Sequence, residues 1–395
     1  MVTPQTFNFA KTPAIYFGTG VFNKLPTLVS RLGKTVLLVT GGASLQKSGR
    51  LDKLCSALTT EGIKSYVFQI SGEPSPEIVD AAVSGHRAFC IDAVVGIGGG
   101  SAIDGAKAIS AMLPLGEGVF NYLEGVGSAQ LHNGSKLPFI AVPTTAGTGS
   151  EATKNAVLSR IGSHGFKKSL RHDNFVPDIA LIDPELTLSC PQDVAAACAM
   201  DAFTQLMESY VSVKASPMTD SLAFGALRLA VENLEASCAP GAVDIAARSA
   251  MAYAATMSGI TLANAGLGVV HGLASSVGAA AAIPHGVVCG TLVAAATSAN
   301  IRALRASGSA AIQKYAEIGS LITGEKLTGK KELTTALNAL LERLSCWSQT
   351  LNMPRLSNFG VKQEHMEAIA GVTSNKESPV RLSRDEIKSI LAERL

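Results

Sequence analysis

The feature that most constrains this chain is a change of pattern near its midpoint. Over residues 1–185, largely apolar runs rich in Val, Ile and Leu alternate with amphipathic stretches such as Arg50–Glu61 and Pro76–Phe89. Continuous apolar strands separated by helices are typical of a parallel sheet that is covered by helices on both faces. The predicted strands are Thr35–Thr40, Ser65–Ile70, Asp92–Ile97, Pro138–Val142 and Ile179–Ile182.

The second half of the chain follows another pattern. After Asp183 no convincing strand appears, and alanine-rich helical segments run from about Pro191 to the end. The last predicted helix, Ser383–Leu395, opens with Ser383 and Glu386 in capping-box spacing. We therefore predict an α/β dinucleotide-binding domain with a parallel sheet over residues 1–185, followed by an all-α domain over residues 186–395.

The balance of charges excludes some functions. The chain has 33 Lys and Arg residues against 31 Asp and Glu, a formal net charge of +2. Such a chain lacks the basic surface that binding to phosphate backbones requires, so we expect no nucleic-acid partner.

The N-terminus lacks the pattern of a signal peptide. The seven cysteines are scattered without CxxC spacing, which is typical of buried free thiols in a reducing cytoplasm.

One long segment, Ser249–Ile301, contains no Asp, Glu, Lys or Arg. It is mostly Ala, Gly, Ser and Thr, and Asn264, Pro284 and two histidines interrupt it. A transmembrane helix needs a run of about 20 strongly apolar residues, so this composition favours tightly packed helices at the centre of the helical domain. We expect no association with a membrane.

Two loops have the composition of a phosphate-binding site. Gly98–Ser101 directly follows a predicted strand and opens a helical segment that contains Asp104 and Lys107. The sequence PTTAGTGSE (143–151) follows the next strand and carries four hydroxyls. Glycines let a backbone approach a phosphate, and ligands bind at the carboxyl ends of parallel strands. The alternatives are a tight turn and ordinary helix capping, but two such loops favour a dinucleotide site.

The helical half contains candidate metal ligands. Asp201 and Gln205 stand four residues apart, so both project from one helix face, and His271 and His285 lie in the charge-free segment. One carboxylate and two imidazoles are a reasonable ligand set for Zn or Fe(II). The alternative is that these are ordinary core histidines, because nothing local indicates that they meet Asp201.

Taken together, these segments resemble the iron-containing (group III) alcohol dehydrogenase family. The resemblance extends from FGTG (17–20) to the final helix, and the fourteen-residue gap between His271 and His285 matches the family's last two metal histidines. It is carried mainly by GGGSAIDGAK (98–107), PTTAGTGSE (143–151), the Asp201 helix and GLGVVHG…PHG (266–286). It implies a dehydroquinate synthase-like fold, a bound NAD or NADP, and a divalent metal, either Fe, Zn or another ion.

The resemblance also implies site residues. It places Gly99, Gly100 and Ser101 at the cofactor pyrophosphate and Asp104 near the nicotinamide. Thr144, Thr145, Thr148 and Lys167 would contact the cofactor. The metal ligands would be Asp201, His271 and His285, with Gln205 at the fourth position.

Three positions depart from the family pattern. Where many members have an Asp after the first cofactor-domain strand, this chain has Gly41, Gly42 and Ser44, so we hypothesise that NADPH is tolerated or preferred. Gln205 replaces a histidine and is a weaker, neutral ligand. Ser275 replaces the histidine linked to proton relay, and serine does not titrate near neutrality, so no catalytic acid or base is assigned.

The function implied is an NAD(P)-dependent, metal-assisted alcohol dehydrogenase or aldehyde reductase acting on a small alcohol or aldehyde. A cytoplasmic homodimer or higher homo-oligomer is expected. Two alternatives remain open: a metal-independent oxo-acid reductase resembling the maleylacetate reductases, and a nucleotide-binding protein that has lost catalysis.

Overall fold

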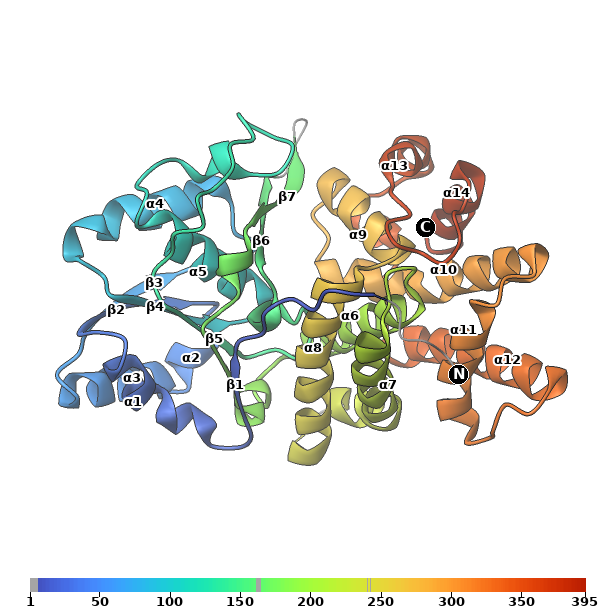
Figure 1. Ribbon diagram of the computed structural model, residues 1–395, viewed down its shortest axis with the longest axis horizontal. Helices are drawn as coiled ribbons and strands as arrows, with labels where there is room; N and C mark the ends of the chain where they lie inside the picture. Colours follow the sequence, from blue (N-terminus) through green and yellow to red (C-terminus); the bar gives the residue numbers. More distant parts are fainter. Residues whose placement is uncertain (1–5, 161–164, 240, 242) are drawn as a thin grey trace. The chain divides into compact units, whose positions relative to one another are not determined.

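The computed structural model describes residues 6–160, 165–239, 241 and 243–395. These form two compact units: an α/β unit, Ala10–Cys190, and a helical unit that comprises Pro191–Leu395 together with residues 6–9 (Figure 1). The α/β unit thus ends at Cys190 rather than near residue 185. The reason is a short 3-10 helix, η6 (Pro184–Thr187). Its Leu186 is buried in the hydrophobic core that also contains Val36 and Leu38 of the sheet.

The α/β unit is built on a six-stranded sheet in which every neighbouring pair is parallel. In spatial order the strands are β1 (Ala14–Phe17), β8 (Ile179–Ile182), β5 (Phe139–Pro143), β4 (Ala93–Gly98), β2 (Thr35–Thr40) and β3 (Lys64–Gln69). The predicted parallel sheet is therefore confirmed, and each of the five predicted strands lies within one residue of its observed position.

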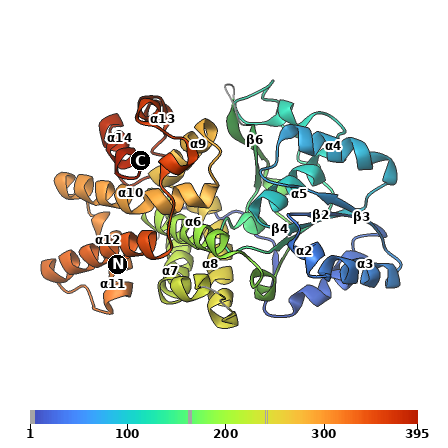
Figure 2. The same cartoon turned by 180° about the vertical axis from the view of Figure 1, so that it is seen from behind.

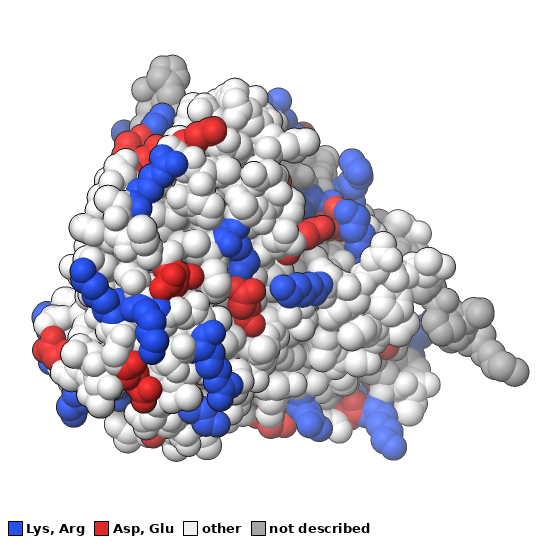
Figure 3. Space-filling view, turned by 60° about the vertical axis from the view of Figure 1, so that its left-hand side comes forward, with Lys and Arg blue, Asp and Glu red and all other residues white. Residues whose placement is uncertain are grey.

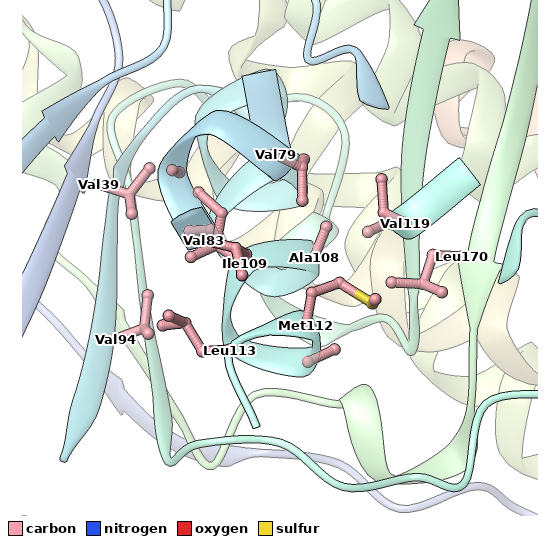
Figure 4. Packing of buried hydrophobic residues seen from close by; sticks show 14 of the residues in the cluster. Val39, Val79, Val83, Val94, Ala108, Ile109, Met112, Leu113, Val119 and Leu170 are labelled. Atoms are coloured by element: carbon pink, nitrogen blue, oxygen red, sulfur yellow. The ribbon is translucent and has the colours of Figure 1, made fainter. Parts of the chain in front are cut away.

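Helices cover both faces of this sheet. Leu37 and Val39 of β2 point to one face, where they pack with α4 (Pro76–His86) and α5 (Gly100–Met112), as Figure 4 shows for Val39. Val36 and Leu38 of the same strand point to the other face, against α1 (Leu25–Ser30) and α3 (Arg50–Thr60). Because a strand alternates sides, an unbroken apolar run is what burial on both faces requires.

The sequence pattern missed three strands. β1 lies at the sheet edge and is mostly exposed. β6 (Asn155–Arg160) and β7 (Phe166–Arg171) form a separate antiparallel pair. Leu158 and Leu170 of this pair are buried in the same hydrophobic core as α5, whereas Lys168 is exposed. Edge and half-buried strands carry polar side chains on one face, so their apolar signal is weak.

The helical unit contains no strand within the described part of residues 191–395, as predicted. Figure 2 shows α6, α7 and α8 of this unit side by side. The Ser383–Glu386 capping box is present at the start of the last helix. Its helices are α6 (Gln192–Val211), α7 (Pro217–Cys238), α8 (Ile245–Ala265), α9 (Val269–Ala280), α10 (His285–Ser307), α11 (Ile312–Thr323), α12 (Lys330–Thr350), α13 (Met366–Val372) and α14 (Arg384–Glu393).

The charge-free segment forms α9, most of α8 and the first part of α10. By length and composition α10 qualifies as a membrane span, and α8 with α9 would qualify as a bent pair. However, 72% of the α10 window is buried within the protein, as in the core helix of a globular domain. On the face seen in Figure 3, basic and acidic side chains are interspersed and no single-sign patch stands out.

The cysteines are less uniformly buried than the sequence analysis expected. Cys238 and Cys289 are buried, whereas Cys90 and Cys346 are exposed. Cys90 follows η2 (Arg87–Phe89), and Cys346 lies on the solvent side of amphipathic α12, so their positions rather than their residue type decide their exposure.

Candidate cofactor and metal sites

The three predicted cofactor loops meet at one edge of the sheet. They follow β2, β4 and β5, which are neighbours, and their carboxyl ends therefore lie together. Backbone hydrogen bonds join them: Gly41 N–H donates to the Ile97 carbonyl at 3.0 Å, and Thr144 N–H donates to the Gly98 carbonyl at 2.9 Å. The sequence indicated each loop separately, and the structure brings all three together.

Glycine is required where these loops approach one another. Gly98 has φ +159°, and a Cβ there would lie 2.6 Å from the Ala102 Cβ. A Cβ at Gly100 would lie 2.6 Å from the Thr148 side chain. Among the described residues no side chain caps the start of α5 at Gly99, so the first N–H groups of this helix can receive an anion. These features fit the pyrophosphate of a dinucleotide.

The other predicted contacts are accessible at this edge. Ser101, Thr144, Thr145 and Thr148 are half-buried. Gly42 and Ser44 are exposed after β2, and a Cβ built on Gly42 meets nothing within 4 Å. Space for a ligand group therefore exists beside Gly42.

Asp104 and Lys107 have interior partners. The Asp104 carboxylate accepts hydrogen bonds from Ser150 Oγ and, at 3.0 Å, from Val157 N–H, while burial raises its pKa. Lys107 Nζ donates to the Ser150 carbonyl at 2.8 Å and to the Asn155 carbonyl at 2.9 Å. Burial lowers the pKa of Lys107 to about 8. Both residues thus tie α5 to the second loop and to β6.

Lys167 lies on β7, outside the main sheet. Its Nζ forms an ion pair with Glu73 Oε2 at 2.9 Å, and the lysine side chain is 12% exposed. The structure therefore gives Lys167 a carboxylate partner within the α/β unit.

A compact group of metal-binding side chains lies in the helical unit. It comprises Asp201 of α6, His271 of α9, and His285 and Cys289 of α10, whose ligand atoms all lie within 4.8 Å of one another. Asp201 Oδ1 is 3.2 Å from His271 Nε2 and 3.8 Å from His285 Nε2. Three of the four predicted ligand positions are thus brought together, and Gln205 is not part of this group. Cys289 was missed, although it stands one helical turn from His285.

Glu208 and two glycines, Gly268 and Gly272, set the position of α9. Glu208 Oε2 lies 2.7 Å from His271 Nδ1, and its Oε1 accepts from Val270 N–H at 2.7 Å. A Cβ at Gly268 would lie 2.7 Å from Glu208 Oε1, and one at Gly272 would lie 1.8 Å from the Ser374 carbonyl oxygen. The motif GLGVVHG therefore allows α9 to begin against the Glu208 carboxylate.

Glycines also allow α10 to approach α6. A Cβ at Gly286 would lie 2.5 Å from the Ala197 carbonyl oxygen, and one at Gly290 would lie 2.9 Å from the Met200 Cβ. Small residues at a helix interface permit close backbone contact. This contact carries His285 and Cys289 toward Asp201.

The electrostatics of this group reflect its tight packing. Burial opposes ionisation of Asp201, but the neighbouring His285 and His271 lower its pKa to about 2. Burial opposes protonation of His271, but Cys289, Asp201 and Glu208 hold its pKa well above the ordinary value. Burial raises the pKa of the Cys289 thiol to about 12. Two carboxylates, Asp201 and Glu208, therefore face the His271 ring from either side.

The donor set fits a divalent transition metal. Because the Glu208 carboxylate accepts the Nδ1 proton of His271, the Nε2 lone pair points at Asp201 Oδ1. Two acceptors at 3.2 Å need a proton or a cation between them. Carboxylate, imidazole and sulfur are the ligands used by zinc and Fe(II).

Gln205 and Ser275, the two departures that lie in the helical unit, form local hydrogen bonds. Gln205 Oε1 accepts a hydrogen bond from Ser258 Oγ of α8 at 2.8 Å. Ser275 Oγ donates to the His271 carbonyl at 2.9 Å, back to its own helix. Neither residue ionises near neutrality, which leaves the acid and base of the reaction unassigned.

Both halves of the chain match the sequence models of known protein families. The sequence model of iron-containing alcohol dehydrogenase matches residues 12–184, and that of the Fe-containing alcohol dehydrogenase C-terminal family matches residues 195–395. The chain belongs to this family. The family assignment makes the chain an NAD(P)-dependent alcohol dehydrogenase or aldehyde reductase, in a family that uses a divalent metal.

Individual relatives agree with this. The NAD-dependent methanol dehydrogenase of Bacillus methanolicus is 31% identical over 92% of each chain. The NADPH-dependent butanol dehydrogenase of Clostridium saccharobutylicum is 30% identical over 95% of each chain. Among solved structures, 1,3-propanediol oxidoreductase superposes with a TM-score of 0.85 at 29% identity, covering 99% of this alcohol dehydrogenase and 100% of that chain.

Proposed function

We propose that this alcohol dehydrogenase binds NADP(H) or NAD(H) at the loops after β2, β4 and β5 and reduces small aldehydes with a divalent cation held by Asp201, His271 and His285. When bound, the cation supplies Lewis-acid polarisation of the substrate oxygen and the nicotinamide supplies or accepts hydride. The observation that carries the proposal is the convergence of the four donor atoms within 4.8 Å.

The chain's own residues have separate roles. Gly99, Gly100 and Ser101 present the start of α5 to the pyrophosphate. Thr144, Thr145 and Thr148 offer hydroxyl groups beside the pyrophosphate. Asp104, near the nicotinamide, and Lys167 are the other two predicted cofactor contacts. Glu208 holds the His271 ring in the tautomer that leaves Nε2 free for the cation.

The adenosine end of the site favours NADPH. Residues 41–44 supply no carboxylate to repel a 2′-phosphate, and Gly42 opens space at the surface. The relatives named above include one NAD-dependent and one NADPH-dependent enzyme. Sequence similarity to them therefore does not decide which cofactor this enzyme uses. Measuring kcat/KM with both cofactors tests this, and a strong preference for NADH would contradict it.

Turnover assays separate the alternatives. We expect NADPH oxidation with a panel of short aldehydes, and loss of activity after chelator treatment followed by recovery with Zn²⁺ or Fe²⁺. Turnover that is insensitive to chelator and selective for oxo-acids would indicate the metal-independent reductase instead. Absence of turnover with every substrate, in protein that binds cofactor, would indicate lost catalysis.

We further propose that the enzyme works in the cytoplasm as a homodimer or higher homo-oligomer. The edge strand β1 supports self-association, because its Ile15 and Phe17 are large apolar side chains that are 41% and 39% exposed at the edge of the sheet. Light scattering coupled to size-exclusion chromatography measures the oligomeric state, and a monomer at micromolar concentration would contradict it.

A further inference from the structure

We infer that Cys289 supplies a fourth, thiolate ligand to the divalent cation, in the position that Gln205 would otherwise fill. The inference rests on the proposed function for the cation itself and on its three other ligands. Cys289 Sγ lies 3.6 Å from His271 Nε2 and 3.8 Å from His285 Nε2. The sulfur thus faces the same point as the predicted ligands.

The spacing of the donor atoms matches tetrahedral coordination. Metal–ligand bonds of 2.0–2.3 Å at tetrahedral angles separate neighbouring donor atoms by about 3.3–3.8 Å. The four separations that involve Asp201 with the two histidines and Cys289 with the two histidines are 3.2, 3.8, 3.6 and 3.8 Å. All six pairwise separations among the four donor atoms are within 4.8 Å, so the four side chains need little movement to bind one ion.

The helices make this arrangement rigid. His285 and Cys289 are four residues apart on α10, so both project toward α6. Gly286 and Gly290 lie on the face of α10 that touches Ala197 and Met200, which fixes the depth at which the sulfur sits. Cys289 is fully buried.

Gln205 is directed elsewhere. Its carbonyl oxygen accepts the hydrogen bond from Ser258 Oγ at 2.8 Å, and coordination would require it to give up or share that contact. An amide oxygen is also a neutral ligand, so a site built with Gln205 would hold the cation with one negative charge. A thiolate and a carboxylate together neutralise a divalent cation. This neutralisation favours binding because an uncompensated charge is costly to bury.

The thiol must lose its proton for this to occur. The metal displaces the proton from sulfur, one metal–sulfur bond forms as the S–H bond breaks, and the proton passes to solvent buffer. No oxidant or reductant takes part. Because a thiolate is a soft ligand, the site should favour Zn²⁺, Co²⁺ or Fe²⁺ over Mg²⁺ or Mn²⁺. The competing explanation is that Cys289 is an inert core residue.

Cobalt substitution tests the inference independently of activity. Full-length protein is stripped with chelator, titrated with Co²⁺ alone, and followed by absorption spectroscopy. We expect the near-ultraviolet thiolate-to-cobalt charge-transfer band in the wild type. Cys289→Ser should still bind Co²⁺, but without the band and at least tenfold more weakly. Gln205→Ala should keep the band, as should the matched control Cys238→Ala, which removes a buried cysteine of α7.

The outcomes separate the two proposals. If wild-type protein binds Co²⁺ without the band, Cys289 is not a ligand, whereas the proposed metal site stands. If it binds no Co²⁺, both fail. Should Cys289→Ser not fold by circular dichroism, the presence or absence of the band in the wild type still decides. A band that survives Cys289→Ser would also overturn the inference.

Discussion

Glu208 and His271 are joined at 2.7 Å, carboxylate to Nδ1, at the point where α9 begins. The second oxygen of the same carboxylate accepts the Val270 N–H, also at 2.7 Å. One acidic side chain of α6 therefore both caps a helix and selects the tautomer of a metal ligand. Carboxylates in this position orient and strengthen the imidazole toward a metal.

Replacing Glu208 should weaken metal binding without touching a ligand. Glu208→Gln removes the charge and leaves one acceptor oxygen for two donors, so we expect a loss of Zn²⁺ affinity of about 10–100-fold, measured by chelator competition. Glu235→Gln, which alters a half-exposed carboxylate paired with Arg343, serves as the control and should change nothing. Unchanged affinity in Glu208→Gln would contradict the positioning role.

Metal removal should lower thermal stability. A ligand that binds only the folded state stabilises it by about 2.7 kcal/mol at 100 times its Kd. For a helical unit of this size we expect chelation to lower Tm by about 5–10 °C, with recovery on adding Zn²⁺, measured by calorimetry. In His271→Ala the Tm should no longer respond to chelator. A wild-type Tm insensitive to metal would count against the site.

A carboxylate beside the adenosine end should reverse the cofactor preference. Gly42 is exposed and a Cβ there meets no atom within 4 Å, so Gly42→Asp introduces charge without a clash. We expect kcat/KM for NADPH to fall at least tenfold, corresponding to about 1.4 kcal/mol of repulsion, while that for NADH changes little. Gly42→Asn separates size from charge, and an equal loss in Asn and Asp would refute the electrostatic explanation.

Lys107 should give the stability a pH dependence of defined sign. Its pKa is lowered from 10.5 to about 8 by burial, so between these values the unfolded chain binds a proton that the folded chain has lost. Stability contributed by this group therefore rises with pH across that window, by up to about 1.4 kcal/mol per pH unit, and the cost of the buried charge is fully present below pH 8.

Comparison with Lys107→Met isolates this effect. Denaturant unfolding at pH 7.5, 9 and 10 should show the wild type gaining stability relative to Lys107→Met as the pH rises. The exposed Lys53 of α3 provides the control substitution, Lys53→Met, which should run parallel to the wild type. A stability difference between wild type and Lys107→Met that stays constant with pH would show that the lysine does not titrate in this range.

Local patterns predicted much of the fold. Apolar runs such as Thr35–Thr40 predicted strands because burial on both faces of a sheet leaves no room for polar side chains. The half-buried pair β6 and β7 was missed because Lys167 and Lys168, on opposite faces of β7, interrupt its apolar pattern. Glycine loops after strands were visible for a similar reason: a close backbone approach tolerates few other residues.

The metal group shows where sequence alone stopped. Residue types made Asp201, His271 and His285 candidate ligands beside the alternative of ordinary core histidines, and the family resemblance implied their role at a metal. The sequence did not determine that these residues meet, because Asp201 lies 70 positions from His271 and the contact depends on how α6, α9 and α10 pack. That packing also brought in Cys289 and Glu208, which no local pattern distinguishes from core residues. Tertiary structure placed the Cys289 sulfur beside the two imidazoles and oriented the His271 ring, since close contact at Gly272, Gly286 and Gly290 sets distances that spacing along a chain does not encode.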